Sequence, residues 1–310
     1  MTGEPIQDND LFKYDSDTDS IIKKHDLIND TEHQTELFEA DPLDGGDWSG
    51  VGAGSFFEKD GIYYLSFRRR KPTDRGYKYE LWTSSDLYNW TQLWEVLTSD
   101  MDVSSVEGSS IWYDGAYWYF YFSADWGTGN DWRIHYIKSS TVCGLASLLA
   151  DNTQWNQVFT NHKDPRLMYW NGTYYMLARN TDGYEVLYSA STLDTTSWSS
   201  VYDFSSIEPA NSHVGIILYD SSSSKFIYWG VGKRTYHFHW WAISDDLSSW
   251  TYVEKEDYTD KHLWYPYYNA PTSQTIYIIS SFSFDDNTAP LYLWDYGPQA
   301  TSLTLTVTKV

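Results

Sequence analysis

Residues 163–180, KDPRLMYWNGTYYMLARN, contain two apolar and aromatic segments that flank Asn171 and Gly172. An Asn-Gly pair between alternating apolar residues is typical of a β-hairpin, because both residues accept the positive φ of a two-residue hairpin turn. The stretch therefore predicts a hairpin whose first strand begins near Asp164.

Four other stretches align with this hairpin on their turns. They are AGSFFEKDGIYYLSF (53–67), EGSSIWYDGAYWYFYF (107–122), HVGIILYDSSSSKFIYWG (213–230) and HLWYPYYNAPTSQTIYIIS (262–280). A pattern that returns about every 50 residues is typical of a repeat array or a propeller.

A second repeated unit lies between the hairpins. Here a strand leads into SSDLYNW (84–90), STLDTTSW (191–198) or SDDLSSW (244–250), and a looser version ends at Trp155. The two units together give four strands per repeat, so the sequence predicts an all-β fold, a five-bladed β-propeller over residues 46–310. The C-terminal stretch SLTLTVTKV (302–310) is then expected to be the outer strand of the fifth blade.

The composition agrees with this fold and excludes several partners. Aromatic residues make up 19% of the chain, and we expect most of them to fill the space between stacked blades. With 43 Asp and Glu against 21 Lys and Arg, the net charge of -22 disfavours nucleic acid and fits a salt-rich habitat. Cys143 is the only cysteine, so no intramolecular disulfide can form.

The N-terminal residues 1–45 are polar and lie outside the repeat. They show no Sec-type signal, and no apolar run in the chain approaches the roughly 20 residues of a membrane span. The acids Asp15, Asp17 and Asp19 resemble the start of a calcium loop, but Ser20 replaces the required Gly and Asp26 the final Glu, which favours a solvated turn. We expect this arm to lie away from the propeller and to attach the protein to other subunits of an assembly.

A polar site is predicted at the mouth of the central channel. In a propeller the first strand of every blade lines the channel, and the alignment places one residue of each hairpin at an equivalent position: Ala53, Glu107, Asp164, His213 and His262. Ionisable side chains seldom gather at buried strand starts by chance. The groups can satisfy one another, act as a carboxylate pair in glycoside hydrolysis, or hold a divalent cation such as calcium through His213 and His262.

The stretches VEGSSIWYDGAYWYFYF (106–122) and KDPRLMYWNGTYYML (163–177) resemble blade openings of five-bladed glycoside hydrolases of family 43 and its relatives in families 32 and 117. The resemblance implies that Glu107 corresponds to the general acid and Asp164 to the carboxylate that orients it. His213 or His262 resembles the channel histidine near a bound ion or water. We expect the substrate to be bound by His213, His262, Arg179 and Trp112.

The sequence departs from the family at the general base. The first-blade Asp of the family corresponds to Ala53, which cannot accept a proton, and the Glu precedes the Asp in this chain. Asp47 and Asp102 are the acids in neighbouring loops that would have to replace this base. If Glu107 and Asp164 lie close together, one of them should keep its proton to higher pH unless a cation lies between them.

Two hypotheses from different classes follow. The first is a carbohydrate-binding propeller on a virion or extracellular surface assembly, such as a tail fibre, spike or capsid decoration, that engages a host surface glycan or glycoprotein receptor. The alternative is an active glycoside hydrolase that uses Glu107 and Asp164 as its acid and base. The missing base favours the binding protein.

Overall fold

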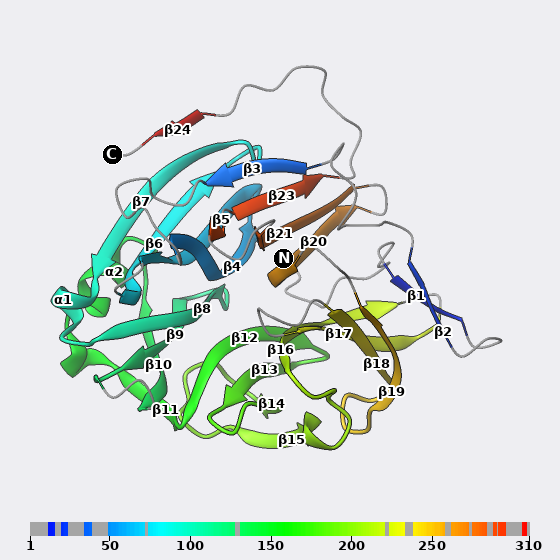
Figure 1. Ribbon diagram of the computed structural model, residues 1–310. Helices are drawn as coiled ribbons and strands as arrows, with labels where there is room; N and C mark the ends of the chain where they lie inside the picture. Colours follow the sequence, from blue (N-terminus) through cyan, green and yellow to red (C-terminus); the bar gives the residue numbers. More distant parts are fainter. Residues whose placement is uncertain are drawn as a thin grey trace.

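The computed structural model describes residues 12–15, 20–23, 34–38, 49–71, 74–127, 131–220, 223–232, 238–257, 262–272, 275–283, 288–289, 291–295 and 306–308. Four of its sheets contain four antiparallel strands, and a six-stranded sheet contains four more, and we call these sets of four strands blades one to five. Figure 1 shows them around a common centre, with the first strand of each blade innermost. The prediction of an all-β propeller is confirmed.

Blades one to four each use four consecutive strands. Blade one contains β4 (Ser49–Lys59), β5 (Ile62–Lys71), β6 (Asp74–Ser84) and β7 (Asn89–Leu97). Blade two contains β8 (Ser105–Tyr113), β9 (Trp118–Asp125), β10 (Trp132–Ser139) and β11 (Asn156–Thr160). Blade three contains β12 (His162–Trp170), β13 (Thr173–Asn180), β14 (Glu185–Ala190) and β15 (Ser199–Asp203). Blade four contains β16 (Ser212–Asp220), β17 (Lys225–Gly232), β18 (Phe238–Ser244) and β19 (Thr251–Asp257).

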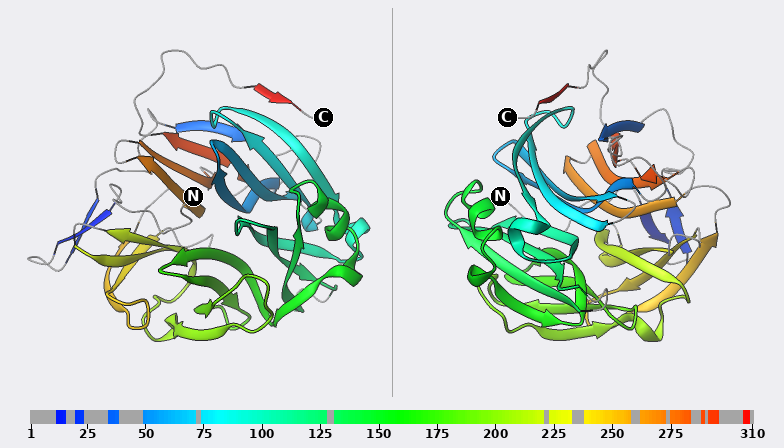
Figure 2. Two further views of the ribbon diagram at one scale, coloured as in Figure 1. Left: turned by 180° about the vertical axis from the view of Figure 1, so that it is seen from behind. Right: turned by 60° about the vertical axis from the view of Figure 1, so that its left-hand side comes forward.

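Blade five takes its outer strand from the N-terminal segment. It contains β20 (His262–Thr272), β21 (Thr275–Ser283), β23 (Leu291–Asp295) and β3 (Gln34–Phe38), and β3 pairs antiparallel with β23. The expectation that residues 302–310 form this strand is wrong, because β24 (Thr306–Thr308) instead pairs in parallel with β7 of blade one. Figures 1 and 2 show these two terminal strands beside blades five and one.

The expectation that the N-terminal arm lies away from the propeller is also wrong for its described residues, because residues 34–38 join blade five and residues 12–15 and 20–23 contact blade four. Phe38 is 4% exposed and packs between Phe67 and Trp82, with ring centroids 4.9 Å from each. The strand edge of β23 needs a backbone partner, and β3 supplies it while it closes the ring. Nearer the N-terminus, β1 (Phe12–Asp15) and β2 (Ser20–Lys23) pair antiparallel, with Asp15 at the end of β1 opposite Ser20, while Asp17 and Asp19 lie outside the described residues.

The remaining elements are short. They are α1 (Thr98–Met101), α2 (Gly144–Leu149), the 3-10 helices Asn152–Gln154 and Phe204–Ser206, and β22 (Thr288–Ala289), which extends the sheet of blade one beside β4. In the described part of the chain, no helix has the length and apolar character needed to cross a membrane.

The second sequence repeat forms the turn between the third and fourth strands of blades one and four. In blade one Ser84 Oγ accepts hydrogen bonds from the backbone of Asp86 and Leu87, and the indole of Trp90 donates to the Leu87 carbonyl at 2.7 Å. Leu87 has a φ of 71° and is 1% exposed, so the turn both reverses the chain and buries its apolar residue. Blade four repeats these contacts with Ser244, Asp246, Leu247 and Trp250.

Aromatic side chains fill the space between blades, as the composition predicts. One cluster joins blades one and two through Tyr79, Trp94 and Phe120, where the rings of Tyr79 and Phe120 meet edge to face at 5.3 Å. Two further clusters join blade two to three and blade three to four. Such contacts favour edge-to-face and tilted geometries, and they make the strand starts around the channel a rigid frame.

Candidate functional site

Each first strand contains a β-bulge at the same register. Two of its residues lie opposite one residue of the second strand, and the bulged pairs are Ala53–Gly54, Glu107–Gly108, Asp164–Pro165, His213–Val214 and Tyr265–Pro266. A bulge breaks the alternation of a strand and re-aims its side chain. The repeated bulge therefore explains why Glu107, Asp164 and His213 occupy equivalent places in blades two, three and four.

The expectation for blade five is wrong in register. The bulge contains Tyr265, whereas His262 begins β20 opposite Ser283, three residues before it. In this blade β20 continues to Thr272, which pairs with Thr275, and it contains a second irregularity between Asn269 and Thr272, so the turn lies later in the sequence than the alignment assumed. The side chain of His262 lies outside the described part of the structure, as does that of Ala53.

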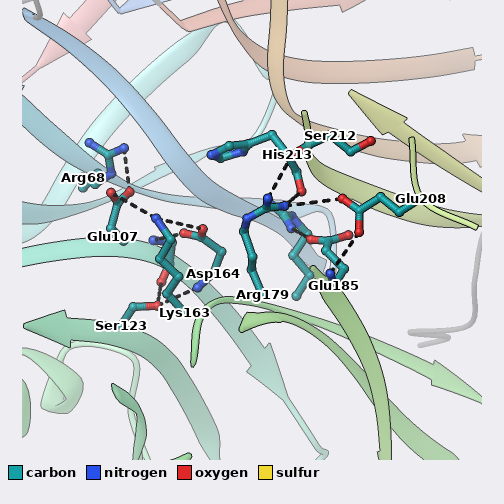
Figure 3. A network of polar contacts seen from close by, with 12 residues as sticks. Arg68, Glu107, Ser123, Lys163, Asp164, Arg179, Glu185, Glu208, Ser212 and His213 are labelled. Carbon is teal, nitrogen blue, oxygen red and sulfur yellow. Dashed lines mark hydrogen bonds and ion pairs between the residues drawn. The ribbon is translucent and has the colours of Figure 1, made fainter. Parts of the chain in front are cut away.

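Glu107 and Asp164 come together from adjacent blades, as predicted, and a cation lies between them. Lys163 Nζ is 3.7 Å from Glu107 Oε1 and 3.8 Å from Asp164 Oδ2, and Arg68 Nη2 is 2.7 Å from Glu107 Oε2 (Figure 3). Each carboxylate therefore faces at least one basic side chain. The exception stated for the pair, a cation between the two carboxylates, is therefore the arrangement found.

Asp164 is fixed through its backbone as well as its side chain. Its φ of 58° is unusual for a residue with a Cβ, and its N–H donates to Ser123 Oγ at 2.8 Å. Its Oδ1 accepts the N–H of Gly108 at 2.9 Å, which links the bulge of blade three to that of blade two. Asp164 is thus a structural connection between blades as well as a strand start.

The Glu107 bulge is held from blade one. Tyr79 OH donates to the carbonyl of Glu107 at 2.7 Å, and it also lies 3.0 Å from the Ser123 carbonyl. Tyr79 is fully buried, and burial raises the pKa of its phenol well above the usual 10, so it stays a neutral donor. Blade one therefore contributes Arg68 and Tyr79 to the site, although its own bulge carries Ala53.

Exposure decides which of these groups a ligand can reach. Glu107 and Asp164 are 0% exposed, whereas the Lys163 side chain retains 14% and His213 is partly exposed. A general acid must reach the glycosidic oxygen within hydrogen-bond distance. The two carboxylates therefore lie beneath the reachable surface, and Lys163 and His213 belong to it.

A second polar cluster joins blades three and four beside His213. Arg179 Nη2 donates to the Ser212 carbonyl at 2.9 Å and Nη1 donates to the His213 carbonyl, and Glu208 Oε1 lies 3.6 Å from Nη1. Arg179 was expected to bind substrate, but it is 3% exposed and its guanidinium is directed at the backbone of the next bulge. Figure 3 places the His213 ring between this cluster and the Glu107 pair.

Glu185 is the centre of that second cluster. Its Oε1 accepts from Arg166 Nη1 at 3.1 Å, and its Oε2 accepts from Tyr228 OH at 2.5 Å and from the Gly215 N–H at 3.0 Å. Burial raises the pKa of this carboxyl, while Arg166 opposes the shift. Glu185 lies opposite Arg179 within blade three, and its hydrogen bonds with Tyr228 and Gly215 link this blade to blade four.

Burial, followed by repulsion from Arg179 and Lys163, places the pKa of His213 well below its ordinary 6.5. His213 is therefore neutral at neutral pH and can accept a hydrogen bond through one ring nitrogen. No three His, Cys, Asp or Glu side chains of the described residues converge on a metal position. The calcium hypothesis involved His262, whose side chain is not described, and it stays a prediction.

The other expected site residues lie elsewhere or are undescribed. Trp112 packs between blades, 5.2 Å from the Phe57 ring and 6.2 Å from the Tyr174 ring, so it belongs to the core. Asp102 is exposed at the C-terminal end of α1, and no hydrogen bond or ion pair in the described structure joins it to Glu107. Asp47 lies outside the described residues.

The sequence analysis missed Arg68 and Lys163, the two basic residues beside Glu107. Arg68 begins the run RRRK (68–71), which stands out in a chain of net charge -22. Arg68 and Arg179 occupy equivalent positions in the second strands of their blades. Each directly follows the residue that lies opposite the bulge of its own blade. Each reaches the bulge of the following blade, a contact that no local pattern predicts because it joins separate repeats.

We expect His135 to make the protein less stable in mild acid. It is 4% exposed among the rings of Phe122, Trp126 and Trp155, and burial, with a smaller effect of Arg133, lowers its pKa to about 4. Between about pH 6.5 and 4 the unfolded chain binds a proton that the folded histidine does not, so stability falls with a slope approaching about 1.4 kcal/mol per pH unit.

Urea unfolding of the parent and of His135→Phe across this pH range measures that slope. Phe keeps an aromatic ring in the cluster but cannot take up the proton, so the variant should lose stability less steeply as the pH falls. Equal slopes in the two proteins would contradict the assignment to His135.

No protein-family model and no curated protein sequence matches this chain. Solved structures do resemble it, including the exo-β-1,3-galactanase 1,3Gal43A of Clostridium thermocellum (TM-score 0.60, 12% identity, 84% of this chain and 62% of that one). Others are the RS223 β-xylosidase (TM-score 0.60, 12% identity, 90% of this chain and 100% of that one) and the GH32 β-fructofuranosidase BmSUC1 of Bombyx mori. The last has a TM-score of 0.57 and 11% identity over 82% of this chain and 62% of its own.

This chain therefore spans less than two thirds of the galactanase and of the fructofuranosidase. Identities near 12% show a shared architecture and leave the activity open. By fold, the chain is a β-propeller similar to those of GH43 and GH32 glycosidases.

Proposed function

We propose that this propeller binds a carbohydrate at the channel mouth without hydrolysing it. The proposal rests on the surroundings of Glu107. This residue is 0% exposed, and its two oxygens face the guanidinium of Arg68 and the ammonium of Lys163. A group in this condition is poorly placed to donate a proton to a leaving group. The residue aligned with the family's general base is Ala53, which cannot activate water.

We further propose that this binding serves attachment. In this proposal the protein is part of a virion, as a tail fibre, spike or capsid decoration, and engages a host surface glycan or glycoprotein. The polar segment before β3 would contact other subunits of that assembly. Support comes from the segment's composition and from the absence of a base at the first bulge, since attachment needs affinity and no turnover.

The alternative is hydrolysis with Glu107 and Asp164 as acid and base. It is favoured by the close approach of two carboxylates from adjacent blades to one ammonium group. Because both carboxylates are enclosed, this mechanism requires the strand starts to rearrange when substrate binds.

One screen distinguishes the two functions. The parent protein and Glu107→Gln are incubated with arabinan, xylan, galactan and arrays of host surface glycans, and retained binding and released reducing ends are both measured. We expect the parent to bind at least one glycan and to release none, and Glu107→Gln to bind about tenfold or more weakly, because it removes a charge that holds Lys163. Release of sugar by the parent, lost by orders of magnitude in Glu107→Gln, would instead establish the hydrolase.

A further inference from the structure

Among Arg68, Glu107, Lys163 and Asp164, the side chain of Lys163 is the most accessible. It is held in place from three sides. Its ammonium lies between Glu107 and Asp164 and 5.4 Å from the centre of the Trp132 ring. Its backbone pairs with Arg179 directly before the bulge. The ring supports the side chain while the two carboxylates fix its charged end, so the ammonium has a defined position before any ligand arrives.

The ammonium has no hydrogen-bond acceptor among the described residues. Both carboxylate contacts are longer than the 2.7–3.2 Å or so of an N–H···O hydrogen bond. A lysine ammonium has three N–H donors, and donors left without an acceptor in a partly enclosed site are costly. Because 14% of the side chain is exposed, an acceptor oxygen from outside the protein can satisfy them.

We propose that Lys163 is the residue that contacts the ligand, and that it donates hydrogen bonds to hydroxyl oxygens of the saccharide. This inference rests on the proposed carbohydrate-binding function and specifies how it is achieved. Glu107 and Asp164 act as positioning residues beneath Lys163, and Arg68 in turn holds Glu107. The charges of these four groups cancel, so the ligand needs no negative charge of its own.

His213 completes this reachable surface from the next blade. It is partly exposed, and its ring is directed toward the side of the channel that holds Glu107 (Figure 3). A neutral imidazole beside an ammonium gives one acceptor next to several donors. Adjacent hydroxyl groups of a sugar ring, each both donor and acceptor, fit such a pair.

The first test compares two substitutions with different chemistry. Lys163→Met keeps a long apolar side chain on Trp132 but removes every donor, and we expect it to weaken binding of the oligosaccharide identified in the screen by about 10- to 100-fold. Lys163→Arg keeps charge and donors, and should retain more affinity than Lys163→Met. The matched control is Lys225→Met, which removes a lysine from an exposed ion pair with Asp245 and should bind like the parent. Thermal unfolding of each variant verifies that it is folded.

The second test needs no substitution. Lysines of the parent are labelled by reductive dimethylation with and without saturating oligosaccharide, and each site is quantified by mass spectrometry. Lys163 should be protected by the ligand, whereas Lys59, Lys138 and Lys225, which form exposed ion pairs, should react equally in both samples.

The outcomes separate this inference from the function on which it rests. If the oligosaccharide binds but leaves Lys163 unprotected and Lys163→Met binds like the parent, carbohydrate binding stands and the role of Lys163 is overturned. If neither the screen nor the labelling detects binding of any saccharide, the proposed function fails and the inference fails with it.

Discussion

Replacing Glu185 with leucine is expected to lower the free energy of unfolding by about 3 to 5 kcal/mol. The carboxylate is fully buried and accepts hydrogen bonds from Arg166, Tyr228 and Gly215. Removing one partner of a buried ion pair is far more costly than the net stabilisation that the pair provides, because it leaves a desolvated charge and unsatisfied donors. We expect this stability to be lost because the contact between blades three and four is weakened.

Urea unfolding at pH 7 measures this loss, with Asp245→Leu as the matched control. Asp245 also pairs with a lysine, Lys225, but its side chain is 75% exposed, so its replacement should cost less than about 1 kcal/mol. Glu185→Gln should fall between the two, since the amide can still accept hydrogen bonds but lacks the charge. A cost for Glu185→Leu as small as that of the control would show that this cluster does not hold the blades together.

The repeats predicted the propeller because they are local. Each hairpin carries its own turn residues, and at Asn171 and Gly172 the φ values of 47° and 83° are those that such a turn requires. The turns at Trp90 and Trp250 are equally local, since Ser84 and Ser244 bond the backbone only two and three residues ahead. Spacing and periodicity therefore suffice to predict the order of strands.

Ring closure could not be predicted in the same way. The strand β3 is five residues long and does not resemble a repeat, and its partner β23 lies more than 250 residues away in the sequence. Both ends of the chain carry short β-forming segments, so either one could have completed blade five. The choice depends on the burial of Phe38 against blade one, which is a tertiary contact.

Only part of the site could be predicted, because the sequence repeats show positions within a blade but not contacts between blades. Alignment identified Glu107, Asp164 and His213 because the bulge repeats in every blade, and it misplaced His262 because the first strand of blade five is longer and contains a second irregularity. Arg68 and Lys163 were missed because their roles depend on the neighbouring blade. Their presence changes the chemical interpretation of the carboxylates, from an acid and base to two groups that hold a cation.

Replacing Gly108 with alanine is expected to disrupt the site and destabilise the protein together. A Cβ at this position would lie 2.7 Å from Asp164 Cα and 2.7 Å from Asp164 Oδ1. The first of these atoms belongs to the backbone of the next blade, so it cannot move aside as a flexible side chain would. Separating the two bulges would also break the hydrogen bond from the Gly108 N–H to Asp164, for a combined cost of about 3 kcal/mol.

Gly115→Ala provides the control for this substitution. Gly115 has a φ of 105° and nothing within 4 Å of an added Cβ, so alanine there should cost only about 1 kcal/mol of backbone strain and leave glycan binding intact. Urea unfolding and glycan binding are measured on both variants. Because Asp164 adjoins Lys163, displacing its backbone should weaken binding by more than tenfold even where Gly108→Ala is still folded. Unchanged affinity in a folded Gly108→Ala would mean that the ligand does not depend on the junction of blades two and three, and the binding site would then have to lie elsewhere on the propeller.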